Sequence, residues 1–133
     1  MNFTLDTYAW IEYFEGSQDG KKIKDIIEGG SKHKLFTPSV VLAELSDSIV
    51  RGKVKTEWEQ LIRFVTLNTH ITEINQNMVR ESGIIKNSLR KNHPNIGLID
   101  AIVLATARAV NSKLLTGDSH LTEEVDVINI KKL

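Results

Sequence analysis

The sequence predicts an α/β protein, a three-layer α/β/α sandwich with a short central parallel sheet. The first observation is that short segments rich in strand-forming residues alternate with longer segments whose apolar residues recur at helical spacing. Strands that alternate with helices pair in parallel, and their helices cover both faces of the sheet. The second observation is size: 133 residues, 41% of them hydrophobic, suit one domain, which we expect to span residues 1–133.

The first half of the chain is predicted to hold two strands and four helices. These are a strand at 2–6, helices at 7–16 and 17–30, a strand at 34–37, and helices at 38–52 and 56–68. Gly16 and Gly30 are typical of helix ends. Pro38 suits the first position of a helix, with Thr37 as its cap. The last of these helices is amphipathic and is predicted to turn Trp58 inward.

The second half is predicted to hold two helices and three strands. These are a strand at 71–74, helices at 76–92 and 95–110, and strands at 113–116 and 125–130. Asn75 is a suitable cap for the first helix, and Pro94 terminates it. The second helix is almost entirely apolar, and we expect Asp100 to lie in its middle. An unpaired carboxylate in such surroundings costs several kcal/mol, so Asp100 needs a distant partner or a wet pocket.

Composition excludes several classes of protein. The chain has no cysteine, which excludes a disulfide scaffold and a thiolate zinc site and favours a reducing cytoplasm. No apolar run is long enough to span a membrane, and the N-terminus lacks the pattern of a signal peptide. The net charge is zero. Basic residues gather at 32–34, 51–55 and 86–93, where they suit either a solvated surface or contact with nucleic acid.

Four acidic residues occupy places where solvated acids are uncommon. Asp6 closes the first strand, and Asp118 follows the strand at 113–116. Glu44 and Asp100 lie inside apolar helical segments, and no basic residue follows Asp100 within two helical turns before Arg108. Because functional sites of parallel sheets form outside the carboxyl ends of the strands, we expect the four acids to share one site.

Each acid also has a purely structural interpretation, which for Asp100 is an ion pair with Arg108. Asp6 suits the N-cap of the helix that follows it. Glu44 is placed to pair with a basic side chain such as Lys55 or Arg108. Asp118 suits a turn or the cap of a short helix. A shared site explains all of them at once, whereas the structural interpretation needs a separate reason for each.

Clustered carboxylates without cysteine or histidine suit a hard divalent cation, Mg²⁺ or Mn²⁺. The cation offsets the repulsion between the acids and supports phosphoryl chemistry by activating a water molecule. The neighbouring hydroxyls of Thr7 and Thr116 are placed to hold a phosphate oxygen or a water molecule.

Four stretches, "LDTYAWIEYF", "PSVVLAEL", "GLIDAIVLATA" and "LLTGDSHL", occur in an order that resembles the PIN domain, most closely its VapC-like toxins. The resemblance covers essentially the whole chain and implies a set of catalytic and metal-binding acids: Asp6, Glu44, Asp100 and Asp118. Thr116 matches the family's hydroxyl residue before the last acid. The family often has a second Asp two residues after that acid, and here His120 stands there, so one cation is a safer expectation than two.

The resemblance also implies an activity and partners. It implies a metal-dependent ribonuclease that acts on single-stranded RNA, leaves a 5′-phosphate and a 3′-hydroxyl, forms a homodimer and is inhibited by a small antitoxin. An RNA-processing nuclease outside a toxin–antitoxin pair is one alternative. Another is a catalytically idle module that binds RNA or protein. An aspartyl-phosphate receiver domain fits poorly, because the first strand ends in a single acid rather than a pair.

Overall fold

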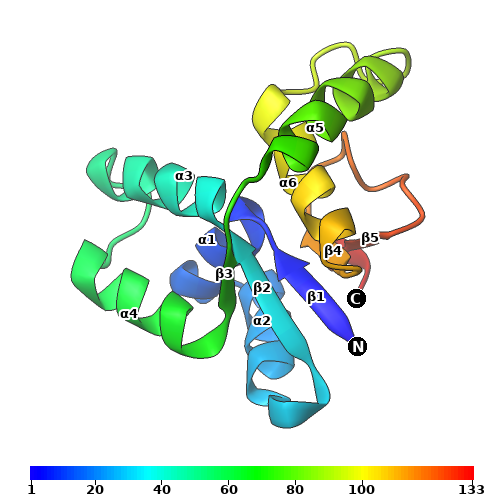
Figure 1. Cartoon of the computed structure of the whole chain (residues 1–133). Helices are drawn as coiled ribbons and strands as arrows, with labels where there is room; N and C mark the ends of the chain where they lie inside the picture. The colour runs from blue at the N-terminus through cyan, green and yellow to red at the C-terminus, as the bar shows by residue number, and fades with distance from the viewer.

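Five parallel strands form the centre of the molecule (Figure 1). The computed structural model describes residues 1–133, apart from the side chain of Ser31. The strands are β1 (Asn2–Leu5), β2 (Lys34–Pro38), β3 (His70–Thr72), β4 (Lys113–Thr116) and β5 (Val127–Asn129). Their order across the sheet is β3-β2-β1-β4-β5, and every neighbouring pair is parallel. The predicted fold class is therefore confirmed.

The helices occupy the connections between these strands. They are α1 (Thr7–Glu15), α2 (Gln18–Glu28), α3 (Ser39–Val50), α4 (Trp58–Asn68), α5 (Gln76–Leu89) and α6 (Leu98–Ala109). The first four connect β1 to β2 and β2 to β3, whereas α5 and α6 lead back across the sheet from β3 to β4. Right-handed crossovers in opposite directions place their helices on opposite faces. In Figure 1, α5 and α6 accordingly lie side by side, apart from α1 and α2.

The strand order reverses between β1 and β4, which lie next to each other in the middle of the sheet. Leu5, the last residue of β1, pairs with Leu115 of β4. The chain leaves β1 toward one side and β4 toward the other, which opens a crevice above their carboxyl ends. Asp6 and Asp118 follow these two ends directly, so the topology itself brings them to one edge.

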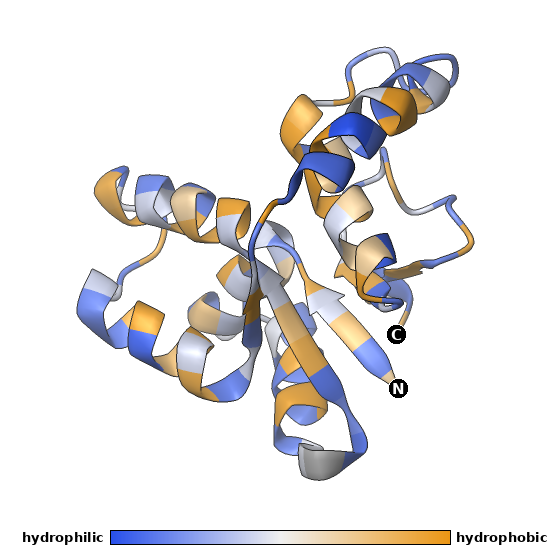
Figure 2. Ribbon diagram, viewed as in Figure 1, coloured by the Kyte–Doolittle hydropathy of each residue, from blue (hydrophilic) through white to orange (hydrophobic). Residues whose placement is uncertain are grey.

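The core consists of the buried strands and the inward faces of the helices. Figure 2 shows β2 as mostly hydrophobic, whereas α5 mixes both kinds of residue. Trp10 of α1 is fully buried and donates a hydrogen bond from its indole N–H to the Thr37 hydroxyl at 3.1 Å. It belongs to the core and is not available to stack on a nucleobase. None of the helices in the described part of the chain is both long and apolar enough to cross a lipid bilayer.

The start of α6 differs from its prediction. The helix begins at Leu98 rather than at residue 95, so Asp100 lies in its first turn and not in its middle. The Asp100 carboxylate accepts a hydrogen bond from the backbone N–H of Gly97, the residue that caps the helix, at 3.2 Å. A negative charge is favourable in this place because the first-turn N–H groups lack helical partners and carry the positive end of the helix dipole.

Other boundaries also differ. Thr37 does not cap α3, because β2 continues through Pro38 and the Thr37 hydroxyl is hydrogen-bonded to Thr69 in the core. Trp58 begins α4 and is 36% exposed, so the prediction that it faces inward is wrong. The helix predicted at 76–92 ends at Leu89, before the turn that precedes Pro94. The cap predicted at Asn75 is confirmed by its hydrogen bond with the N–H of Met78.

Candidate active site

Asp6 lies at the junction of β1 and α1. Its backbone N–H continues the pairing with β4 by donating to the carbonyl of Leu115, at 3.4 Å. Its carboxylate accepts a hydrogen bond from the N–H of Ala9 at 2.9 Å and thereby caps α1. The structural interpretation of Asp6 as a cap is therefore correct. The cap uses only one of the acceptor sites of this carboxylate, however, and Asp6 is only 7% exposed to solvent.

Asp118 is held in a tight turn after β4. Its backbone N–H donates to the hydroxyl of Thr116 at 3.0 Å, and its carboxylate accepts from the N–H of His120 at 2.9 Å. The N–H of Leu121 donates to the Asp118 carbonyl at 3.0 Å. Thr116 is fully buried, and its hydroxyl also donates to Asp6. Thr116 thus connects the first and last acids of the predicted set.

Glu44 reaches the site from the middle of α3. Its carboxylate accepts a hydrogen bond from the hydroxyl of Thr7, at the first position of α1. Neither partner suggested for Glu44 is used, because Arg108 is engaged elsewhere and Lys55 takes part in none of the ion pairs found among the described residues. A threonine hydroxyl leaves the negative charge of Glu44 uncompensated.

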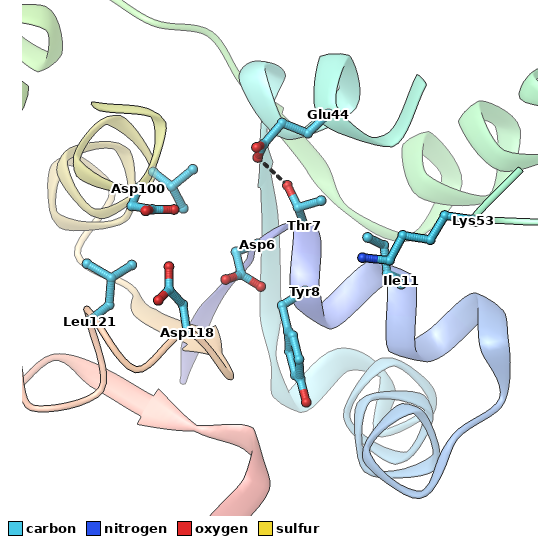
Figure 3. Close-up of a pocket in the computed structure, with 10 residues that line it drawn as sticks. Asp6, Thr7, Tyr8, Ile11, Glu44, Lys53, Asp100, Asp118 and Leu121 are labelled. Atoms are coloured by element: carbon cyan, nitrogen blue, oxygen red, sulfur yellow. Dashed lines mark hydrogen bonds between the residues drawn. The ribbon is translucent and has the colours of Figure 1, made fainter. Parts of the chain in front are cut away.

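The four acids line one pocket of about 330 Å³ at the carboxyl edge of the sheet (Figure 3). Figure 3 shows Asp6, Asp100 and Asp118 directed toward a common space, with Glu44 turned to Thr7 beside it. The remaining wall consists of one hydroxyl residue, apolar and aromatic side chains and one cation: Thr7, Tyr8, Ile11, Lys53, Val103 and Leu121. Residues from both ends of the chain therefore meet in a cavity that is open to solvent and rich in oxygen atoms.

The electrostatics of the pocket are those of an acidic cluster in which none of the four acids takes part in an ion pair found among the described residues. Burial raises the pKa of Asp6 to about 7; hydrogen bonds from Thr116 and Ala9 oppose this rise, and the charges of Asp118 and Asp100 add to it. Burial also raises the pKa of Asp100 to about 6, helped by the adjacent Asp118 and opposed by the N–H of Gly97. Such displaced carboxyl pKa values in a cavity are typical of functional sites.

The donor set fits a hard divalent cation in its chemistry. Its ligand atoms are carboxylate and hydroxyl oxygens, and burial raises the pKa values of Asp6 and Asp100, with a further contribution from the charge of Asp118. The side chains are not closed around a point, since no three acidic or histidine side chains in the described part of the chain are gathered tightly enough to enclose an ion. A cation bound here would draw Glu44 and the aspartates together.

Arg108 does not neutralise any of the four acids. It lies near the other end of α6 and donates to Asp126 at 2.7 and 3.1 Å and to Glu124 at 3.0 Å. The structural alternative in which Asp100 or Glu44 is paired with Arg108 is therefore wrong.

Tyr8 of α1 also belongs to the pocket. Its ring lies against Gly117, where any Cβ would collide with it, and its hydroxyl donates to Asp19 of α2 at 2.9 Å. Gly117 therefore brings α1 close to the turn that carries Asp118. The pairing depends on tertiary contact, and the only sequence signal is the glycine between Thr116 and Asp118.

His120 packs beside the pocket rather than lining it. Its ring meets that of His93 edge to face, with centroids 5.6 Å apart, and its Nδ1 is buried without a hydrogen-bond partner among the described residues. The pocket wall after Asp118 is completed by Leu121, which is 1% exposed. This turn thus supplies one carboxylate to the pocket.

Comparisons with known proteins show the family and the fold of this chain. The family model described as PIN domain matches residues 3–126. A chain of a toxin–antitoxin complex from Klebsiella pneumoniae is 20% identical, with 96% of both chains covered and a TM-score of 0.71. A chain of VapBC2 from Rickettsia felis, bound to a DNA fragment from their promoter, is 18% identical over 97% of both chains, with a TM-score of 0.73. A chain of VapBC-1 from nontypeable Haemophilus influenzae is 20% identical over 98% of this chain and 99% of that chain, with a TM-score of 0.67. No curated protein sequence matches.

Proposed function

The chain belongs to the PIN domain family, and from this premise we propose that it is a metal-dependent endoribonuclease that hydrolyses phosphodiester bonds of single-stranded RNA. The observation that supports this function best is the common pocket of Asp6, Glu44, Asp100 and Asp118 at the switch point of the sheet. Four acids that form no ion pair among the described residues suit a cation and a phosphate ester better than any structural purpose.

Each residue of the pocket has a distinct part in this proposal. Asp6, Asp100, Asp118 and Glu44 would hold Mg²⁺ or Mn²⁺. The bound cation supplies Lewis-acid chemistry, lowering the pKa of a water molecule and stabilising negative charge on the leaving oxygen. Thr116 acts as a positioning residue, because its buried hydroxyl connects Asp6 to the backbone of Asp118. Thr7 holds Glu44 at the edge of the pocket.

The proposed reaction is an in-line hydrolysis. The oxygen of a water molecule forms a bond to phosphorus, and the bond between phosphorus and the 3′-oxygen breaks with its electron pair going to that oxygen. The water loses one proton and the 3′-oxygen gains one, which leaves a 5′-phosphate and a 3′-hydroxyl.

Cleavage of a fluorescent single-stranded RNA with Mg²⁺ or Mn²⁺ tests the proposal. Asp100→Asn should lower the rate by roughly a hundredfold or more, since it removes one charge from the site at constant size. Asp25→Asn is a matched control, because Asp25 is an exposed acid of α2 outside the pocket. Cleavage that survives Asp100→Asn, or that continues in excess chelator, would contradict the mechanism.

We also propose that the protein is the toxin of a toxin–antitoxin pair, acts in the cytoplasm as a homodimer, and is inhibited by a small antitoxin. The likeness of its fold to chains of toxin–antitoxin complexes supports this proposal. Expression should arrest growth, and a small protein encoded next to this gene should relieve the arrest. Light scattering should give twice the chain mass of 15.0 kDa. An RNA-processing nuclease outside such a pair would cause no arrest that a neighbouring gene product relieves.

A catalytically idle module is the second candidate. Two observations favour it: His120 stands where the family often has a further acid, and the carboxylates are not closed around one point. This candidate predicts RNA or protein binding with no turnover in either metal ion. The cleavage assay therefore separates the two candidates directly.

A further inference from the structure

The acidic pocket continues into a second cavity along α3. The second cavity has a volume of about 440 Å³ and shares Thr7, Ile11, Glu44 and Lys53 with the first. Together they form a trough in which the aspartates lie at one end and the last turn of α3 at the other. A single strand of nucleic acid is long enough to occupy both cavities at once.

Lys53 is the cation that the trough presents to a ligand. Among the described residues that line the acidic pocket, it alone carries a positive charge. Figure 3 shows its ammonium turned toward the pocket beside Ile11, across Thr7 from the aspartates. The Lys53 ammonium takes part in none of the ion pairs found among the described residues. Its three N–H donors are therefore open to a ligand.

The neighbouring Arg51 differs from Lys53 in this respect. It lines only the second cavity, and its guanidinium is paired with Asp47, one helical turn back, at 3.1 Å. Lys55, two residues beyond Lys53, lines neither of the two cavities. Of the basic group at 51–55, the structure thus singles out one residue.

The backbone fixes Lys53 in its place. Gly52 has a left-handed φ of +75° and donates to the carbonyl of Ile49 at 2.9 Å, while the N–H of Lys53 donates to the carbonyl of Ser48, also at 2.9 Å. These bonds define a Schellman motif, which reverses the chain at the end of α3. The buried Val54, 2% exposed, then anchors the chain against the core.

The motif does not itself require a lysine. The residue that follows the left-handed glycine commonly makes an apolar contact with the last helical turn, whereas here the next residue, Val54, provides the apolar anchor. A charged side chain held by a fixed backbone at the rim of a cavity is well placed to bind a ligand.

We propose that Lys53 binds a backbone phosphate of the substrate next to the scissile one and so sets the position of the strand in the trough. This inference rests on the proposed nuclease function and adds a phosphate subsite to it. An ammonium here attracts a polyanion toward a pocket whose own carboxylates repel it. The scissile phosphate then lies at the aspartates, and the strand continues along α3.

The test measures binding of an unstructured single-stranded RNA oligonucleotide by fluorescence anisotropy at several salt concentrations. All proteins carry Asp118→Asn to prevent cleavage, and the compared variants are Lys53→Met, Lys53→Arg and Lys55→Met. Lys53→Met should weaken binding by roughly three- to tenfold and lower the slope of log K against log salt by about 0.7, the effect of one phosphate contact on a single strand. Lys53→Arg should keep the slope, and Lys55→Met should match the parent.

The outcomes separate this inference from the nuclease function. Equal binding by the Lys53→Met and Lys55→Met proteins would overturn the inference, and RNA cleavage by the protein with an intact Asp118 would leave the nuclease function standing. Binding that depends on Lys53 without any cleavage would contradict the nuclease function and reduce the inference to a phosphate contact of a binding module. If the protein neither cleaves nor binds RNA, both are overturned. Thermal unfolding of each variant checks that the fold is retained.

Discussion

Two groups of acidic side chains lie near opposite ends of α6, and their surroundings shift the carboxyl pKa values in opposite directions. Near the N-terminal end, Asp100 lies with Asp6 and Asp118, and burial together with mutual repulsion raises carboxyl pKa values. Near the C-terminal end, Glu124 and Asp126 surround Arg108, whose hydrogen bond lowers the pKa of Asp126. One helix therefore connects an uncompensated acidic cluster to a compensated one.

The difference shows which acidic cluster is structural. A guanidinium that contacts two carboxylates satisfies both, and the group needs nothing from outside the protein. Buried carboxylates without such a partner are unfavourable unless a cation or a proton joins them. We infer that the acids near the N-terminal end of α6 bind a ligand. The acids near its C-terminal end instead hold the segment between β4 and β5 in place through Arg108.

The largest expected effect separates the two groups by activity. Asp118→Asn should lower metal-dependent RNA cleavage by roughly a thousandfold, because it removes a carboxylate from the cation site. Asp126→Asn makes the same chemical change in the compensated group and should leave the rate within about threefold. Single-turnover cleavage with excess enzyme measures both. Similar losses of cleavage rate in the two variants would contradict the assignment of the catalytic site to the cluster that contains Asp118.

The next effect is on stability: in the absence of metal, Asp6→Asn should make the protein more stable than the wild type. Asp6→Asn keeps the cap of α1, because asparagine accepts the N–H of Ala9 as well as aspartate does. It also removes a buried charge whose pKa rises from 3.8 to about 7 on folding. At about 1.4 kcal/mol for each pKa unit, ionised Asp6 destabilises the metal-free protein by about 4 kcal/mol above pH 7.

The pH dependence follows from the same carboxyl group. Because the folded pKa of Asp6 exceeds the unfolded one, the folded state holds the proton longer, and stability falls as pH rises from 4 to 7. Relative to wild type, Asp6→Asn should therefore gain stability over this range and keep a constant advantage above it. Urea unfolding in chelator at several pH values measures the difference. If Asp6→Asn were no more stable than the wild type at pH 8, the conclusion that ionised Asp6 destabilises the metal-free protein would be wrong.

The sequence is sufficient to predict the fold and to name four acids that line one pocket, for a physical reason. Hydrophobic periodicity defines strands and helices locally, and their alternation leaves few topologies. Asp6 and Asp118 were placed correctly because each follows a strand whose end the sequence marks clearly. Asp100 stands out as an acid among apolar residues, but its predicted position in the helix is wrong because α6 begins only at Leu98 and is capped by Gly97 rather than by a polar side chain.

Features that depend on contacts between distant segments were beyond the sequence. Tyr8 of α1 packs so closely on Gly117, in the turn after β4, that a side chain there would collide with its ring. No local sequence pattern indicates this contact. The pairing of Arg108 with Asp126 likewise follows from the position of β5 beside β4. Lys53 was visible only as a member of a basic group, and the Schellman turn at Gly52 distinguishes it.

A third prediction concerns the cation itself. Mn²⁺ should stabilise the wild-type protein by about 2.7 kcal/mol when its concentration is a hundred times its Kd, seen as a higher midpoint of thermal unfolding. The stabilisation should grow from pH 5 to pH 8, because the cation competes with protons on Asp6 and Asp100. Asp118→Asn should lose most of this shift, and Asp126→Asn should keep it. A shift that is equal in both variants would place the ion elsewhere.

The smallest expected effect belongs to the compensated cluster. Arg108→Gln removes a guanidinium that is 39% exposed, so solvent screens its ion pairs and the loss of stability should be about 1 kcal/mol. The loss should shrink at high salt, because screening already weakens the pairs in the wild type. Cleavage should change by less than about threefold, since hydrogen bonds with Thr116 and His120 hold Asp118 independently of Arg108. A large loss of cleavage at unchanged stability would instead mean that the two acidic groups communicate through the turn after β4.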